Sequence, residues 1–373
     1  MDYEIIEIGG TNKLLKKFIS FPRYIYQSNQ YYVQPLLSEI KEKINPLYNP
    51  FFKYGKIKMF GVIDNNKNLV GRIVAIINPV YDKLYGKEYG FFGMFESINN
   101  KEVASLLINQ VKSFFNEMNY KRLIGPVNFT TNDESGILIE GFDQSPTFMC
   151  AYNEKYYQDL IEGCGLVKAI DMFAYKGNVD HIYPEKFNKI LNRILIDPNI
   201  KLRTFDKTIK EEDTKIIFNL YNECFKDVWG FVPLSLDEAN LMTGKFLPFY
   251  DPELIWIAFI NSIPAGFILG LPDINKVLKK INGKLFPFGI IRFYLNKNKI
   301  DSIRVLTLGV LPQFRGLGLE SLLIHRLHER MKAAPYSWGE FSFIMENNFK
   351  MRKVLENLGF KAYKRYRIYE TNI

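Results

Sequence analysis

The chain has 373 residues, 47% hydrophobic and 24% charged, a composition typical of folded globular proteins and unlike that of disordered chains. Its length favours two domains over one. The formal net charge of +9 is typical of proteins that meet a polyanion, such as nucleic acid, an anionic membrane or a phosphorylated cofactor. No run of about 18 apolar residues occurs, which excludes an obvious membrane-spanning helix.

The N-terminal sequence MDYEIIEIGG has neither the basic nor the apolar region of a signal peptide, so we expect a cytoplasmic protein. The three cysteines, Cys150, Cys164 and Cys224, have no spacing typical of a metal site. We therefore predict no disulfide framework and no metal site, and interpret the cysteines as small buried hydrophobic residues.

The first half of the chain predicts an alternation of strands and helices. Apolar residues at helical spacing indicate one helix near 14–19. The segment 31–52 is helical at first and is then broken by Pro46 and Pro50. The pattern around 100–119 indicates a further helix, capped by Asn99 or Asn100. Alternating apolar runs joined by the turn sequence NNKN indicate a hairpin. The predicted strands are 3–8, 56–64, 69–78, 90–97 and 122–129, followed by a helix and a strand within 153–177.

The second half repeats this order after a connector at 178–200 that contains one helix. The predicted strands are 201–206, 254–261, 263–271, 303–311, 340–346 and 362–370, and the predicted helices are 211–226, 236–246, 319–332 and 348–360. Each half therefore reads as one strand, two helices, a meander and a βαβαβ unit. We predict an α+β fold of two tandem domains, each a mixed sheet flanked by helices: 1–177, the connector 178–200, and 201–373.

A glycine-rich turn follows the strand 303–311 and opens a helix. In Gln313-Phe314-Arg315-Gly316-Leu317-Gly318, the glycines let the backbone turn tightly, and the free N–H groups at the start of the helix suit a pyrophosphate. The turn lacks the Lys-Ser/Thr of a P-loop and the second Gly-x-x-Gly element of a Rossmann fingerprint.

The pattern Gln/Arg-x-x-Gly-x-Gly/Ala, preceded by TLGVLP and followed about thirty residues later by NNFKMRKVLENLGF, resembles the acetyl-CoA signature of the GNAT superfamily of N-acyltransferases. The resemblance implies that backbone amides of Gln313–Gly318 hold the CoA pyrophosphate, that the backbone of Leu308, Gly309 and Val310 pairs with the pantetheine arm, and that Asn348 lies near it. The competing interpretation is an ordinary strand-to-helix turn.

One position departs from the family pattern. Where the family commonly carries a tyrosine that protonates the departing thiolate, four residues before the glycine of the last helix, this sequence has Leu355. Tyr363 or Tyr366 on the last strand could supply the proton instead, or the thiolate could leave without a dedicated acid.

The first half lacks the glycine turn, so we do not expect it to bind CoA. Glu134 or Asp133, within NFTTNDESGILIEGFD, could remove a proton from an incoming ammonium, although the same residues are also typical of a plain turn. Arg72, inside an apolar strand, predicts pairing with a buried carboxylate or, alternatively, an anion-binding role. We expect His325 and His328 to be solvated rather than catalytic.

The segment 273–299 is basic and aromatic. It favours either contact with an anionic membrane or a helix packed on the protein's own core. Together with GRIVAIIN, NDESGILIEGFD and GKLFPFGIIR, it makes the chain resemble a bacterial group of tandem GNAT-like proteins, some of which are identified as bacterial ceramide synthases.

The resemblance implies transfer of an acyl group from acyl-CoA to an amine acceptor in a ternary complex. Two alternatives stay open: a Fem-type transferase that uses aminoacyl-tRNA, and a non-catalytic acyl-CoA-binding protein. Because Fem enzymes do not need the CoA turn, we expect no specific nucleic-acid partner.

Overall fold

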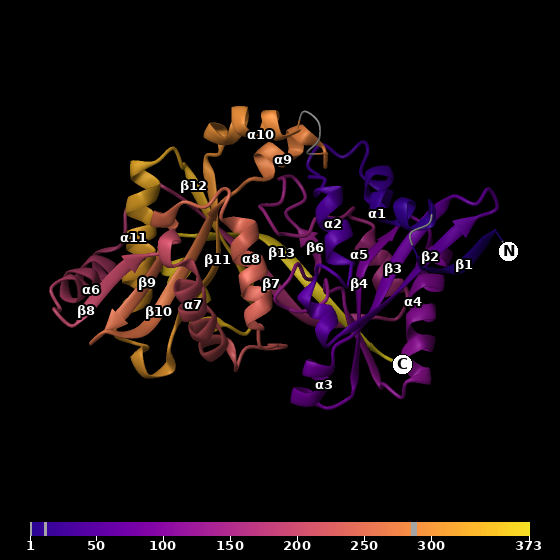
Figure 1. Cartoon of the computed structure of the whole chain (residues 1–373), viewed down its shortest axis with the longest axis horizontal. Coiled ribbons are helices and arrows are strands. Elements are labelled where there is room, and N and C mark those ends of the chain that lie inside the picture. The colour runs from indigo at the N-terminus through magenta and orange to yellow at the C-terminus, as the bar shows by residue number, and fades with distance from the viewer. Residues whose placement is uncertain (1, 11–12, 285–288) are drawn as a thin grey trace. The chain divides into compact units, whose positions relative to one another are not determined.

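A computed structural model describes residues 2–10, 13–284 and 289–373 (Figure 1). The chain forms two compact units. Unit 1 comprises Met1–Asp171, Leu278–Phe293 and Lys364–Ile373, and unit 2 comprises Met172–Val277 and Tyr294–Tyr363. This division differs from the boundaries predicted above, because two later segments of the chain join the first unit.

Unit 1 is built on a mixed sheet whose strands run in the order β1-β2-β3-β4-β5-β13, with β6 also paired to β13. Among the strand pairs of the described residues in this unit, β4 and β5 are the parallel pair. The strands are β1 (Tyr3–Ile8), β2 (Lys56–Asp64), β3 (Leu69–Ile77), β4 (Tyr89–Ser97), β5 (Arg122–Gly125), β6 (Ile137–Glu140) and β13 (Lys361–Asn372). The yellow end of β13 therefore lies among the indigo and magenta elements of unit 1 in Figure 1.

The core of unit 1 lies between this sheet and its helices. The N-terminal cap of α4 is Asn100, whose side chain accepts from the Glu102 and Val103 N–H groups, and the apolar face of α4 joins the core formed by β2, β3 and β4. The helices are α1 (Lys13–Ile25), α2 (Leu37–Lys43), α3 (Pro79–Tyr85), α4 (Lys101–Glu117) and α5 (Tyr157–Gly163).

Unit 2 repeats the plan with the strand order β7-β12-β11-β10-β9-β8, in which only β11 and β12 run parallel. The strands are β7 (Val167–Asn178), β8 (Ile200–Thr204), β9 (Ile255–Ile260), β10 (Ile263–Pro272), β11 (Ser302–Val310) and β12 (Trp338–Met345). The main helices are α6 (Glu185–Leu195), α7 (Lys210–Phe225), α8 (Leu236–Phe246), α11 (Leu319–Ala333) and α12 (Phe349–Asn357). The predicted α+β repeat is confirmed.

Two core clusters lie against the sheet of unit 2. The larger joins α6 and α11 to the strands, and the smaller joins α7 to β9 and β10. None of the helices built from the described residues combines the length and apolar character that crossing a bilayer requires.

Candidate active site

The parallel strands of unit 2 diverge halfway along their length. β11 and β12 pair only from Ser302–Val305 to Trp338–Phe341, whereas β11 stays paired with β10 as far as Val310. The register of β10 and β11 shifts between Leu269 and Gly270, and such a bulge re-aims a strand. The last residues of β11 thus have a ladder partner on one side only.

The backbone of β11 offers hydrogen-bonding groups along this unpaired edge. The Leu311 N–H donates to Ala265 O at 2.9 Å, so Gly309 and Thr307 also face β10, because antiparallel pairing alternates. The N–H and C=O groups of Leu308 and Val310 therefore point away from β10. An extended ligand could pair with this edge as an extra strand does.

The glycine turn follows directly. Gly316 and Gly318 have φ angles of +83° and +93°, values that favour glycine, and Gly318 is the N-cap of α11 without any side-chain cap. The first helical bond is donated by the Leu322 N–H to Gly318 O, at 3.1 Å. The preceding amides at the start of α11 have no helical acceptor, and with the helix dipole they suit an anion.

Arg315 fixes the shape of the turn. Its Nε donates to Val310 O at 3.1 Å and its Nη2 donates to Cys224 O at 3.0 Å, which ties the turn to the end of β11 and to the last turn of α7. Gln313 and Leu317 are exposed, and Phe314 packs against the core. A Cβ on Gly316 would have no atom within 4 Å, so that position is open to a ligand.

Asn348 and Leu355 belong to α12. The Asn348 Oδ1 accepts from the Met351 N–H at 3.2 Å, so this exposed side chain caps the helix. Leu355 is fully buried in the core of unit 2. The structure thus gives both residues a structural role, and proximity of Asn348 to pantetheine stays a prediction.

In unit 1 the corresponding strand edge is filled by the protein itself. β4 and β5 pair only from Tyr89 to Phe91, and the β4 backbone beyond this point is bonded by other groups. The Met94 N–H donates to Asn128 Oδ1 at 2.9 Å, the Ser97 N–H donates to the Tyr157 hydroxyl at 3.2 Å, and the Tyr156 hydroxyl donates to Ser97 O at 2.8 Å. The protein's own groups thus take up hydrogen-bonding positions along this edge.

Glu134 and Asp133 lie in a tight turn between β5 and β6. The Asn128 N–H donates to Glu134 O at 3.0 Å, and Asp133 pairs with Lys43 at 3.2 Å. Burial raises the pKa of the half-buried Glu134 despite the opposing effect of Lys43, and the nearby carboxylates Glu96 and Asp133 add to the rise. Burial alone would lower the pKa of Lys43, but Asp133 and its neighbours outweigh burial and raise it. Glu134 is thus the carboxyl group better suited to hold and release a proton.

A buried hydrogen-bond network centres on Glu96. Of its members, Arg72 was identified from the sequence and the others were not. The Glu96 carboxylate accepts from the hydroxyls of Tyr26 and Tyr157 at 2.8 and 2.6 Å, and Arg72 lies 3.5 Å away. Burial raises the pKa of Glu96 despite Arg72. The predicted pairing of Arg72 with a buried carboxylate is confirmed. Arg72 lies opposite Glu96 in the β3–β4 register. The signal in the sequence was an arginine inside an apolar strand, and the identity of its partner came from the structure.

The two tyrosine candidates belong to different units. Tyr363, in unit 2, donates its hydroxyl proton to the fully buried Glu340, which also accepts from Ser342. Tyr366, in unit 1, is fully buried on β13. An acid role for either residue stays a prediction.

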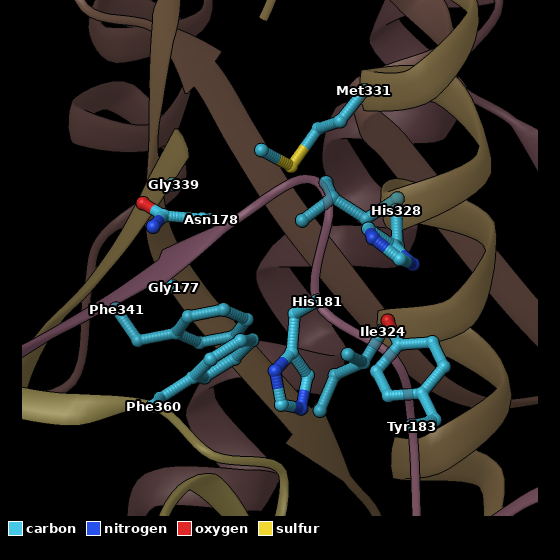
Figure 2. A pocket seen from close by; sticks show the side chains of 11 residues that line it. Gly177, Asn178, His181, Tyr183, Ile324, His328, Met331, Gly339, Phe341 and Phe360 are labelled. Atoms are coloured by element: carbon cyan, nitrogen blue, oxygen red, sulfur yellow. The ribbon is translucent and has the colours of Figure 1, made fainter. Parts of the chain in front are cut away.

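A pocket in unit 2 lies away from the glycine turn (Figure 2). It is lined mainly by apolar side chains and by His181, Tyr183 and His328. The ring centroid of Tyr183 lies 4.8 Å from that of His328 and 6.1 Å from that of His181. The prediction that His325 and His328 are solvated is wrong for His328, which is buried and lies 2.6 Å from Val179 O through Nε2. Burial lowers the pKa of both histidines. The connector that precedes α6 covers this face of α11.

Comparisons with known proteins agree on the fold. No family model matches the chain. The chain is 31% identical to Protein YghO of Escherichia coli (strain K12) over 366 residues, which cover 96% of this chain and 93% of that protein. It is 28% identical to Bacterial ceramide synthase of Caulobacter vibrioides over 363 residues, or 95% and 94% of the two chains.

A solved structure described as a tandem GNAT protein from the clavulanic acid biosynthesis pathway superposes with a TM-score of 0.59 at 11% identity, covering 99% of this chain and 98% of that one. This likeness concerns the fold. Because the match to Protein YghO extends over nearly both full lengths, the relationship covers both units. The chain therefore belongs to the same family as Protein YghO, and its fold is that of the tandem GNAT protein.

Proposed function

We propose that this protein is an acyl-CoA-dependent N-acyltransferase that transfers an acyl group to a primary amine in a ternary complex. The observation that carries the proposal is the strand-turn-helix of unit 2. There the open edge of β11 leads directly into a glycine turn and an uncapped helix N-terminus. One element thus offers backbone groups for an amide-bearing arm and for a diphosphate.

In this proposal, acyl-CoA is held by unit 2. The amides of Gly316–Leu319 bind the diphosphate. The N–H and C=O groups of Leu308 and the N–H group of Val310 pair with pantetheine, while Val310 O keeps its bond from Arg315. An N–H on the same edge would polarise the thioester carbonyl and stabilise the oxyanion that forms during attack.

Glu134 is the proposed base. Its carboxylate takes a proton from the acceptor ammonium, and the neutral nitrogen attacks the thioester carbonyl. The C–S bond then breaks to release CoA thiolate, and the proton that the nitrogen loses as the amide forms passes to that thiolate or to water. A raised pKa makes Glu134 a better proton acceptor than an ordinary carboxylate near neutral pH. Asp133 is the weaker candidate because its charge is engaged by Lys43.

The leaving thiolate does not require a dedicated acid. A thiol has a pKa of about 8.5, so its thiolate is a tolerable leaving group near neutral pH. Tyr363 would first have to give up its bond to Glu340, and Tyr366 is sealed from solvent. We therefore propose that neither tyrosine is essential.

We further propose a lipid-like amine, such as a sphingoid base, as the acceptor. The support is the 28% identity to the protein named bacterial ceramide synthase, over almost the full length of both chains. A small water-soluble amine is the alternative.

The test is a thiol-release screen of acetyl-, medium- and long-chain acyl-CoA against polyamines, amino acids and sphingoid bases. The proposal expects amine-dependent thiol release with at least one long-chain base. Binding of acyl-CoA without thiol release for any amine would instead support a non-catalytic binder, and tight tRNA binding without acyl-CoA binding would support a Fem-type transferase.

A further inference from the structure

The segment between Asp273 and Asp301 concentrates positive charge. It contains seven basic residues and no acidic residue, in a chain whose formal net charge is +9. The basic residues are Lys276, Lys279, Lys280, Lys284, Arg292, Lys297 and Lys299. Lys276 is paired with Asp301, and a remaining cluster of this density attracts polyanions.

Helix α9 (Asn275–Ile281) shows that part of this segment belongs to the core. Its apolar residues are buried: Ile274, Val277, Leu278 and Ile281 are at most 5% exposed. After α9 the chain is tied to unit 1, because the Arg23 guanidinium donates to Asn282 O and the Leu37 N–H donates to Gly283 O at 3.2 Å. Burial of the apolar face of α9 confirms the packed-helix alternative for this helix and leaves its lysines outside.

Helix α10 (Gly289–Asn296) behaves differently. Ile291 and Leu295 are 56% and 72% exposed, and residues four apart share one face of a helix. The start of α10 lies against the end of α9, since a Cβ on Gly289 would lie 2.2 Å from Lys284 O. Figure 1 shows the two helices side by side, in orange. Exposed aliphatic side chains of α10 thus follow the exposed Lys279, Lys280 and Lys284 within one short segment of the chain.

The combination favours one kind of partner. Nucleic acid would use the cations but would gain little from aliphatic side chains, since it binds through phosphate contacts and stacking. An anionic bilayer uses both, because cations meet its surface potential and apolar side chains enter the headgroup boundary.

We propose that α9 and α10 form a docking surface for an anionic membrane, with Ile291 and Leu295 entering the lipid and Lys279, Lys280 and Lys284 facing lipid phosphates. The purpose of this surface, access to a lipid-like amine, rests on the proposed function. Membrane binding does not depend on the proposed function, and it can be measured without turnover.

The experiment is cosedimentation of the full chain with vesicles of phosphatidylcholine alone or with one quarter phosphatidylglycerol. We expect binding at least about tenfold tighter to the anionic vesicles, weakening as salt is raised, since each lysine near the surface contributes about 1 kcal/mol. Equal affinity for both vesicles, or no affinity for either, would overturn the proposal.

Two pairs of variants identify the surface. I291E–L295E should lose at least about tenfold in affinity for anionic vesicles, whereas I182E–I196E, at residues 86% and 80% exposed elsewhere, should not. K280E–K284E should lose a similar factor, and K186E–K189E on α6 should not. If I291E–L295E bound as well as I182E–I196E, and K280E–K284E as well as K186E–K189E, the membrane-binding surface would lie elsewhere.

A final arm separates this proposal from the proposed function. I291E–L295E should retain acyl-CoA binding and turnover of a water-soluble amine, but lose turnover of an amine embedded in vesicles. Competition by RNA for the same surface, removed by the lysine variant but not by I291E–L295E, would assign it to nucleic acid and overturn the membrane proposal.

Discussion

The two units share a plan and differ at one edge. In both, a single parallel strand pair separates after a few residues, β4 from β5 in unit 1 and β11 from β12 in unit 2. In unit 1 the backbone beyond that point is bonded by Asn128, Tyr156 and Tyr157. In unit 2 the edge of Leu308 and Val310 leads into the glycine turn. One fold can thus close the same edge with its own side chains or keep it for a ligand.

The same difference applies to charge. Unit 1 contains half-buried or buried carboxyl groups with raised pKa values, Glu134 and Glu96, and unit 2 contains the helix terminus that we propose binds the anion. The proposed proton acceptor thus belongs to unit 1 and the proposed cofactor turn belongs to unit 2.

The largest expected effect comes from removing the proposed base. E134Q should lower kcat/KM by about 10²–10⁴-fold, the usual contribution of general-base catalysis, while the Kd for acyl-CoA stays unchanged. D133N is the matched control and should have a far smaller effect, because it removes a carboxylate already paired with Lys43. Equal losses in both variants would show that the turn as a whole, and not Glu134, matters.

The next effect concerns the glycine turn of unit 2. G316D should weaken CoA binding by about a hundredfold or more, since like charges brought together cost several kcal/mol. G316N is nearly isosteric, and asparagine also tolerates a positive φ, so it isolates the charge. Calorimetry should find near-normal binding for G316N. Normal binding by G316D would place the diphosphate somewhere else.

A smaller effect is expected on strand β4 of unit 1, where the Asn128 side chain bonds the strand backbone. N128A removes the acceptor of the Met94 N–H and should cost about 1–3 kcal/mol in the free energy of unfolding. The Kd for CoA should not change, because that edge does not hold cofactor. Chemical denaturation and calorimetry measure the two quantities, and a changed Kd would mean that unit 1 takes part in CoA binding.

The smallest expected effect is a dependence of stability on pH. A carboxyl group whose pKa is raised by folding stabilises the protein below its unfolded pKa, and this stabilisation is lost as the pH rises through the folded pKa. E134Q should therefore raise the Tm relative to wild type at neutral pH and lose this advantage near pH 4. If the difference in Tm between E134Q and wild type did not depend on pH, the pKa of Glu134 would not be raised by folding.

Local patterns predicted most of the elements. The hairpin of β2 and β3, the cap at Asn100 and the glycine turn all depend on neighbouring residues, so the sequence shows them directly. The membership of Lys364–Ile373 in unit 1 depends on pairing with Arg122–Gly125. No local pattern encodes a partner so distant in sequence.

In the candidate site, too, some features could be predicted from local sequence and others depend on tertiary packing. Backbone roles near Gly316 follow from a motif, whereas the bond of Arg315 to Cys224 O, the pairing of Lys43 with Asp133 and the burial of His328 depend on tertiary packing. From the sequence, Asp133 and Glu134 were compatible with a plain turn or with a catalytic site. The buried environment of Glu134, seen in the structure, favours the catalytic site.

Amide hydrogen exchange of the full chain with and without CoA tests the central claim most directly. The account predicts slowed exchange at Leu308, Val310 and the amides of Gly316–Leu319, with no change along β4 of unit 1. Slowed exchange along β4, or unchanged exchange throughout the glycine turn at saturating CoA, would contradict it.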